Sequence, residues 1–270
     1  MNQKDRIVAE PNEMKRRTRD FDWAATPLGP REQWPQGLKT AVEIMLGSRY
    51  AMWLGWGPEL TYFYNDAYAE MTLGAKHPWA LGRSAKDVWS ETWADLGPRA
   101  ESVLQTGEAT WDESLMLFLE RRNFLEETYH TFSYSALSAD DGSIGGLLCV
   151  VTEDTERVIG ERRLNTLREL AARTGESVRT VTQACQDVAR VLQNNRKDLP
   201  VALVYLLEHD GQYATLEGVS GIDPASPMCV NRVDLSDRRV HWPFQEVVER
   251  GGGVEVGNLG HHFGEAPAGI

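Results

Sequence analysis

The sequence predicts an α+β fold in which an antiparallel sheet is followed directly by a helix. Two observations carry this prediction. Residues 128–137 combine aromatic, β-branched and small side chains, and residues 144–152 form a nearly unbroken apolar run, so both segments are typical of strands. The turn residues Asp140, Asp141 and Gly142 lie between them, and the glycine permits the positive φ of a short hairpin. The two strands are therefore expected to pair antiparallel.

Length and composition fit a folded chain with two hydrophobic cores. The chain has 270 residues, of which 41% are hydrophobic and 9% aromatic, and this excludes a wholly disordered protein. No run of about 18 apolar residues exists, and the first residues are polar, so we expect neither a transmembrane helix nor a secretory signal, and a cytoplasmic location. A net charge of −12 disfavours nucleic acid, whose binding needs clustered Lys and Arg.

The three cysteines, Cys149, Cys185 and Cys229, are far apart and odd in number. This spacing argues against a disulfide framework and against a zinc site. We interpret all three as reduced thiols at apolar positions, and we predict no metal.

The residues before the hairpin predict the rest of the sheet. Residues 1–20 lack strong periodicity and are expected to be a frayed leader or a short helix, whereas residues 21–34 should be irregular and held by Trp23 and Trp34. A helix over Pro35–Leu46 is expected next, followed by strands at 51–56 and 60–64. A helix at 67–72 capped by Asn65 or Asp66 and short helices at 84–90 and 93–105 come after them. Strands at 110–119 and 124–137 then flank a turn at 120–123. Together with residues 144–152 these strands make a five-stranded antiparallel sheet.

A helix over residues 158–172 is expected to connect the sheet to the second half of the chain. It carries Leu164, Leu167 and Ala171 at a spacing of three and four, with polar residues such as Arg168 between them. This spacing is compatible with a coiled-coil seam, so we expect a parallel homodimer through the connector.

The second half predicts a smaller set of elements. Its first helix has apolar residues at helical spacing, namely Val178, Val181, Cys185, Val188 and Leu192. A hairpin at 201–207 and 213–219, a strand at 229–233, a helix at 244–249 and a strand at 254–256 are expected to follow.

Several segments resemble a known family. Residues 153–157 (EDTER) resemble the Asp-Ile-Thr-Glu-Arg junction that closes PAS domains, residues 62–67 (YFYNDA) resemble the second strand of that family and its Asn-capped helix, and residues 81–84 (LGRS) resemble its Leu-Gly-Arg-Pro segment. The junction departs from the pattern at Glu153, which replaces Asp, and at Asp154, which replaces an apolar residue.

A closer resemblance covers about residues 21–170. Residues 23–30, 64–68 and 125–135 together resemble the N-terminal PAS domains of large soluble bacterial signalling proteins, often histidine kinases, and the remainder resembles the start of a GAF domain. The resemblance implies a leader at 1–34, a PAS sensor domain at 35–154, a signalling helix at 155–174 and an incomplete GAF-like α/β domain at 175–270.

The same resemblance implies a sensory input module, most simply that of a histidine kinase in a two-component system, which passes the state of a ligand or partner to a downstream output domain. The chain itself has no phosphate-binding loop, no Gly-x-Ser-x-Gly elbow and no phospho-acceptor histidine box. Two alternatives remain open. The PAS domain would dimerise without sensing a ligand, or the chain would be the N-terminal part of another signalling enzyme, such as a phosphatase or a cyclase.

Eight of the nine tryptophans lie before residue 112. The simpler interpretation is a core of large aromatic side chains with the leader sealing one face of the sheet. The alternative is an aromatic pocket between the sheet and the short helices, which would hold an unidentified small molecule. The candidate lining residues are Trp53, Tyr64, Trp89, Trp93, Trp111 and Phe132.

No cofactor is predicted, and we expect the purified protein to be colourless. A flavin-thiol photosensor needs a Cys beside the helix after the second strand, and residues 65–107 contain none. Residues 93–105 also lack the axial His of haem-binding relatives. His77 is interpreted as a turn or surface residue, and His130, which alternates with Phe132 and Tyr134, as a hydrogen-bonded core histidine.

The residues expected to transmit a signal are those of the junction, namely Glu153, Asp154, Thr155, Glu156 and Arg157. If the helix starts near Asp154, Glu153 and Arg157 can pair across its first turn; alternatively, Thr155 can cap it.

Overall fold

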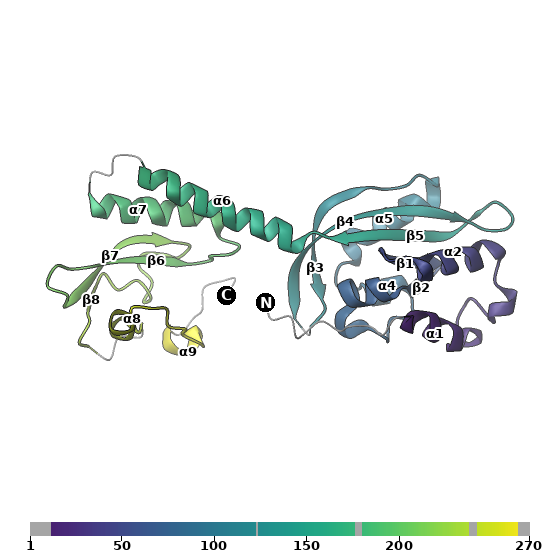
Figure 1. Cartoon of the computed structure of the whole chain (residues 1–270), viewed down its shortest axis with the longest axis horizontal. Helices are drawn as coiled ribbons and strands as arrows, with labels where there is room; N and C mark the ends of the chain where they lie inside the picture. The colour runs from purple at the N-terminus through teal and green to yellow at the C-terminus, as the bar shows by residue number, and fades with distance from the viewer. Residues whose placement is uncertain (1–11, 123, 176–179, 238–241, 264–270) are drawn as a thin grey trace. The chain divides into compact units, whose positions relative to one another are not determined.

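The computed structural model describes residues 12–122, 124–175, 180–237 and 242–263, and the chain divides into two compact units, Met1–Val158 and Ile159–Ile270 (Figure 1). The first unit contains a five-stranded sheet in the order β2-β1-β5-β4-β3, and the second a three-stranded sheet in the order β6-β7-β8. The predicted α+β class with a five-stranded antiparallel sheet is confirmed.

The large sheet is antiparallel at every pair of neighbouring strands. Its strands are β1 (Ala51–Trp56), β2 (Thr61–Tyr64), β3 (Asp112–Glu120), β4 (Leu125–Ser138) and β5 (Ile144–Glu153). The hairpin from which the prediction began joins β4 to β5, with Tyr134 opposite Cys149 and Gly142 at a φ of 84° in the turn.

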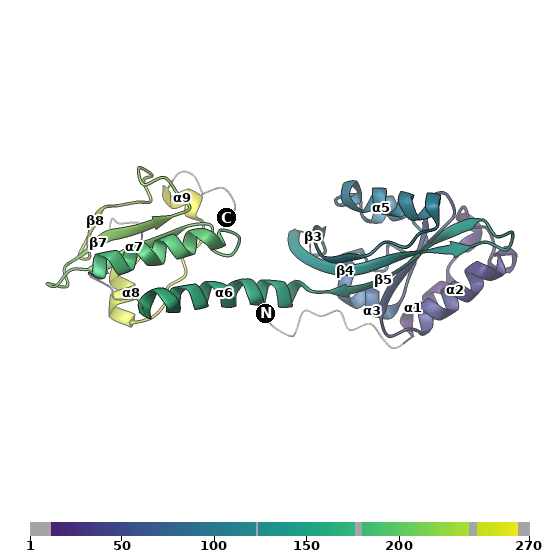
Figure 2. The ribbon, with the colours of Figure 1, turned by 90° about the horizontal axis from the view of Figure 1, so that it is seen from above.

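Strand alternation gives this sheet two buried faces. Trp53 pairs with Cys149 on one face, and their neighbours Leu54 and Leu148 pair on the other. Figure 2 shows the sheet between α5 and α2. The first face is covered by α3 (Asp66–Tyr68), the π-helical turn η4 (Ala69–Leu73), η5 (Gly74–Lys76), α4 (Ala85–Val88) and α5 (Trp93–Thr106), and the second by α2 (Gln36–Gly47).

The leader is more ordered than the sequence suggested. Helix α1 (Glu13–Asp20) buries Met14 completely, and the Asp66 carboxylate accepts hydrogen bonds from the backbone amides of residues 12 and 14. Of the two alternatives for this segment, the short helix is confirmed in the described part and the frayed leader is wrong there. One buried methionine and one buried threonine are too few to show a helical period in the sequence. Two single turns, η2 (Trp23–Ala25) and η3 (Arg31–Gln33), follow, and the Trp23 ring stacks on Phe63 at 4.4 Å.

The helix predicted at 67–72 is divided. Asn65 caps α3 by accepting a hydrogen bond from the Tyr68 amide at 3.0 Å, and the chain then widens into η4. Of the two candidate caps, Asn65 therefore serves α3 and Asp66 serves α1.

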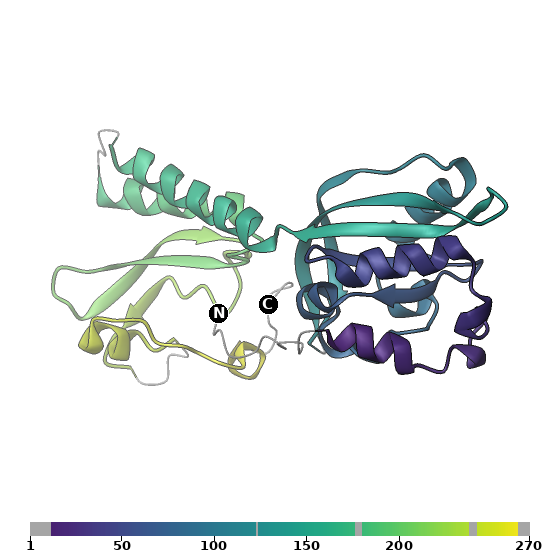
Figure 3. The same cartoon turned by 45° about the vertical axis from the view of Figure 1, so that its right-hand side comes forward.

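Helix α6 (Thr155–Gly175) starts in the first unit and continues into the second. The second unit adds α7 (Val181–Leu192), η6 (Gln193–Asn195), β6 (Ala202–Leu207), β7 (Tyr213–Ser220), β8 (Arg232–Asp234), α8 (Phe244–Arg250) and α9 (Leu259–Phe263) (Figure 3). Helix α7 packs closely on β7, where a Cβ at Gly218 would lie 2.7 Å from the Ala189 Cβ.

Two predictions for this half differ from the described structure or lie outside it, and one helix was not predicted. The strand expected at 254–256 is irregular coil, because glycines flank it on both sides and it pairs with no described strand. Helix α9 had no clear pattern in the sequence. Val178, expected in the first helix of this half, lies outside the described residues.

Candidate functional site

A cavity lies on the inner face of the large sheet, between the strands and the short helices. Its volume is about 30 Å³. Pockets for cofactors and drug-sized ligands measure about 300–1,000 Å³, so this space is at least about tenfold smaller than such a pocket. The lining residues are Trp53, Tyr68, Thr72, Trp89, Leu96, Leu117, Leu119, His130, Phe132, Tyr134, Cys149 and Val151.

His130 is the unusual member of this lining. Strand alternation in β4 turns it inward with Phe132 and Tyr134, and its side chain is 2% exposed. Neither ring nitrogen has a hydrogen-bond partner among the described residues. The expectation of a hydrogen-bonded core histidine was therefore wrong, because its strand neighbours and the facing helices present mainly rings and aliphatic groups.

Burial also determines the charge of His130. Removal from water disfavours the imidazolium and lowers the pKa of His130 to about 4, although the nearby Glu153 carboxylate acts in the opposite direction. The ring is consequently neutral at pH 7, with one nitrogen as a donor and the other as an acceptor.

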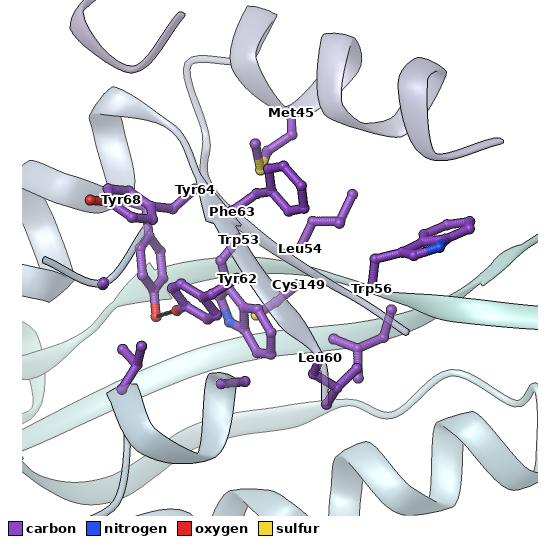
Figure 4. Packing of buried hydrophobic residues seen from close by; sticks show 14 of the residues in the cluster. Met45, Trp53, Leu54, Trp56, Leu60, Tyr62, Phe63, Tyr64, Tyr68 and Cys149 are labelled. Carbon is purple, nitrogen blue, oxygen red and sulfur yellow. Dashed lines mark hydrogen bonds between the residues drawn. The ribbon is translucent and has the colours of Figure 1, made fainter. Parts of the chain in front are cut away.

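A short chain of hydrogen bonds reaches the cavity from the other side. The Trp89 indole donates to the Tyr62 hydroxyl at 2.9 Å, and the Tyr62 hydroxyl bonds to that of Tyr68 at 2.9 Å. Figure 4 shows Tyr62 beside Trp53 and Cys149, whereas Leu54 and Phe63 point toward Met45 of α2. Burial raises the pKa of both tyrosines well above the usual value, so their hydroxyls stay protonated.

The structure divides the six candidate pocket residues. Trp53, Trp89 and Phe132 line the cavity. Tyr64 is buried outside it, Trp93 is half-buried on α5, and Trp111 is 69% exposed just before β3. Trp111 was misplaced because β3 begins at Asp112, two residues later than predicted.

His77 lies in a turn, as expected, but its side chain is only 7% exposed and is not at the surface. Its Nδ1 lies 3.0 Å from the Tyr64 hydroxyl and its Nε2 lies 3.2 Å from Oε1 of Glu13. The imidazole therefore ties the leader helix α1 to strand β2. Sequence spacing gives no sign of this contact, since 64 residues separate His77 from Glu13.

The second part of the candidate site is the junction between β5 and α6. The Asp154 carboxylate accepts hydrogen bonds from the hydroxyls of Thr131 and Ser114 and pairs with Arg157 at 3.3 Å. The Thr155 hydroxyl accepts a hydrogen bond from the Tyr129 amide at 3.0 Å. Side chains at the start of the helix are thus bound to strands β3 and β4.

Two expectations for the junction were wrong. Arg157 pairs with Asp154 and not with Glu153, and the Thr155 hydroxyl binds β4 and does not cap α6. The reason is the position of Glu153, which still belongs to β5 and faces Arg121. Glu156 is exposed at the surface of the first turn.

A bulge in β3 brings Ser114 to this junction. The register of β3 against β4 shifts between Asp112 and Leu115, and Ser114 has a φ of 47°. Its amide donates to Thr131, and its hydroxyl accepts from Arg157 at 2.7 Å. Strained backbone of this kind persists where the surrounding contacts hold it.

Arg121, which the sequence analysis missed, connects the two parts of the site. Its guanidinium donates to Glu153 at 2.9 Å, to Glu126 at 3.0 Å and to the backbone oxygen of Met71 in η4 at 2.9 Å. The side chain is 11% exposed. Because Thr72 of the same turn lines the cavity, Arg121 links the wall of the cavity to the end of β5.

The three residues of the expected dimer seam lie on the surface of α6. Leu164 and Leu167 are exposed, the latter by 63%, and Ala171 is exposed as well. The structure therefore leaves the apolar face of this helix accessible within the chain.

The described residues contain no group of three or more His, Cys, Asp or Glu side chains placed to hold a metal ion. None of their helices is both long and apolar enough to cross a membrane.

No family model and no curated protein matches this chain. Among solved structures, an RNA-binding light-oxygen-voltage receptor is similar over 56% of this chain and 43% of its own length, with 18% identity and a TM-score of 0.36. The PAS domain of Bordetella pertussis BvgS is similar over 49% of this chain and 97% of its own length, with 17% identity and a TM-score of 0.32. A sensory box sensor histidine kinase from Vibrio cholerae is similar over 43% of this chain and 87% of its own length, with 13% identity and a TM-score of 0.28. The chain thus spans less than half of the light-oxygen-voltage receptor.

Proposed function

We propose that residues 35–154 form a PAS sensor domain and that the chain is the sensory input module of a cytoplasmic bacterial signalling protein. The sequence motifs of the strands and the junction, together with the five-stranded antiparallel sheet, support this assignment. In the same proposal, residues 155–174 are the signalling helix and residues 175–270 a GAF-like domain. The output domain is a histidine kinase, with a phosphatase or a cyclase as the alternative.

One observation carries the proposal. Helix α6 begins at Thr155, directly after Asp154, and the side chains of both residues are bound to β3 and β4. Glu153 is bound through Arg121 to the wall of the cavity. A change in the sheet that alters these contacts changes the free energy of the first turns of α6. A ligand or partner that favours one arrangement of the sheet then shifts the population of the helix.

The proposal is tested by hydrogen exchange on the whole chain. Val151→Ala removes two methyl groups from the cavity wall in β5, close to the junction. We expect the amides of residues 158–164 in α6 to exchange about tenfold faster, because a local loss of about 1.4 kcal/mol raises an opening equilibrium tenfold. The amides of α7 serve as the internal control and should change less than twofold.

A second candidate function is a dimerisation scaffold without a ligand. The exposed apolar face of α6 at Leu164 and Leu167 favours it. A pure scaffold predicts that Val151→Ala leaves the amides of α6 and α7 equally unaffected. Equal exchange in both helices would therefore exclude the sensory proposal and leave the scaffold.

A further inference from the structure

Several polar groups face the cavity of the first unit without full hydrogen bonding from the described residues. They are both ring nitrogens of His130 and the hydroxyl of Thr72, and the Tyr68 hydroxyl lies at the end of the chain from Trp89. Buried polar side chains normally have a partner, and two unsatisfied residues in one cavity are unusual. The described residues supply no such partner, and water or a ligand in the cavity can supply it.

The charge of the cavity restricts that ligand. None of its lining residues carries a charge at pH 7, since the His130 imidazole and the Cys149 thiol are both held neutral by burial. An ion that entered would lose its hydration without finding an opposite charge among the lining residues, and this is far more costly than burying a neutral polar group that finds hydrogen bonds. The polar groups do, however, include both donors and acceptors.

The size of the cavity sets a second limit. A volume of about 30 Å³ accommodates on the order of one to three water molecules. A molecule of a few heavy atoms therefore enters with small movements of the surrounding side chains, whereas larger ligands need the helices to move.

We propose that His130 and Thr72 form the polar end of a binding site for a small uncharged molecule that both donates and accepts hydrogen bonds, of the short amide or alcohol class. The aromatic wall of Trp53, Phe132 and Tyr134 would enclose its apolar part. The site deepens the proposed sensory function and rests on it for its biological purpose. His130 also lies directly opposite Glu153, the first residue of the junction, in the β4–β5 register, so a ligand bound to His130 would lie beside the junction.

The test uses three molecules of nearly equal shape on the whole chain. Acetamide both donates and accepts hydrogen bonds, acetone only accepts them, and acetate carries a negative charge. With histidine side chains labelled for NMR, and His130 assigned through the His130→Phe variant, we expect acetamide to shift the His130 signals saturably at millimolar concentration. Acetone should bind at least tenfold more weakly, and acetate should cause no saturable shift at pH 7.

Two threonines provide matched variants. Thr72 and Thr92 are both buried with a hydroxyl that lacks a partner among the described residues, but only Thr72 lines the cavity. Thr72→Val should weaken acetamide binding at least tenfold, and Thr92→Val should change it less than twofold. Equal effects of the two variants would place the ligand elsewhere and overturn the proposal.

Equal binding of acetate and acetamide would overturn the uncharged class. If no molecule of the three shifts His130, the cavity holds solvent only and the inference fails. The proposed function is judged separately, because the hydrogen-exchange response of α6 to Val151→Ala is measured without any ligand.

Discussion

His130 shows how a single residue can make the fold less stable and still define its site. A buried imidazole with two unsatisfied nitrogens costs about 1–3 kcal/mol relative to an apolar ring of similar shape. The pKa of about 4 adds a pH dependence, because the unfolded chain binds a proton near pH 6.5 and the folded chain does not. The folded state therefore loses stability as the pH falls from about 6.5 toward 4, and the loss is absent at neutral pH.

The first prediction follows from this pH dependence. Relative to His130→Phe, the wild-type first unit should lose about 2–3 kcal/mol of unfolding free energy between pH 7 and pH 4.5. Urea unfolding followed by tryptophan fluorescence measures it, since eight of the nine tryptophans lie before residue 112. The charged groups that act on His130 are Glu153, Asp154 and Arg121, and the variant retains all three. Parallel stability curves for the two proteins would contradict the assignment.

At the scale of elements, Arg121 holds three segments together, namely η4, the start of β4 and the end of β5. Arg121→Met leaves the partly buried carboxylates of Glu126 and Glu153 without their cation. Breaking a buried pair in this way costs about 3–5 kcal/mol, so we expect a loss of that order in the urea unfolding of the first unit.

A charge-free triple variant is the control for Arg121. Combining Arg121→Met with Glu126→Gln and Glu153→Gln should restore most of the lost stability, because no unpaired charge remains buried. A loss of less than about 1 kcal/mol in the single variant would mean that solvent screens the cluster and that it does not hold the three segments.

Helix α6 carries the prediction on association. Leu167 is well exposed in the middle of the expected seam. If two chains pair through this face, Leu167→Glu places a like charge in the seam of both copies and should give monomers in light scattering. Arg168→Ala, on the neighbouring exposed position, should leave the dimer intact. A wild-type chain that is monomeric at high concentration would exclude the seam.

The sequence predicted the elements of the first unit well because their signals are local. Strand alternation, the turn at residues 140–142 and the cap at Asn65 each involve neighbouring residues, and their boundaries were placed within about two residues. The contacts of Arg121 join residues 32 and 50 positions away. No single-sequence pattern marks such pairs, so the link between the cavity and the junction was invisible before folding.

The candidate site was predictable to a similar extent. Trp53, Trp89 and Phe132 were placed in the lining because aromatic residues on one strand face or beside it tend to gather in the core. The missing partners of His130 could not be foreseen, since satisfaction of a buried group depends on every side chain around it. The partner of Glu153 could not be foreseen either. The sequence suggested Arg157, whereas in the structure Glu153 belongs to the end of β5 and pairs with Arg121.

At the scale of the whole molecule, α6 is the one covalent element shared by the two compact units. Within the second unit it is fixed by a pair between Arg162 and Asp198 at 2.8 Å, which lowers the pKa of Asp198 to about 2. The pair contributes fully to the unfolding free energy above about pH 4. The contribution is lost as the pH falls toward 2, because the Asp198 carboxyl binds a proton at a higher pH in the unfolded chain than in the folded chain. In the proposed mechanism, a change at the start of α6 would act on a helix that this pair anchors farther along.

Whether the junction side chains transmit such a change is tested by a double-mutant cycle. Val151→Ala is introduced into the wild type and into a chain that also carries Asp154→Ala and Thr155→Val, which removes the contacts to Ser114, Thr131 and Tyr129. Glu153 is kept, because its loss would remove one of the two carboxylates that pair with Arg121. We expect the tenfold faster exchange at residues 158–164 to fall to less than twofold, a coupling free energy of about 1 kcal/mol.

Glu156→Ala provides the control for this cycle, because Glu156 is exposed in the same turn and has no hydrogen bond to the sheet among the described residues. It should preserve the full response of α6 to Val151→Ala. If the response is equally large in all three backgrounds, the backbone alone connects β5 to α6. The side chains of Asp154 and Thr155 would then only fasten the start of the helix, and a shift in the sheet would reach the second unit without them.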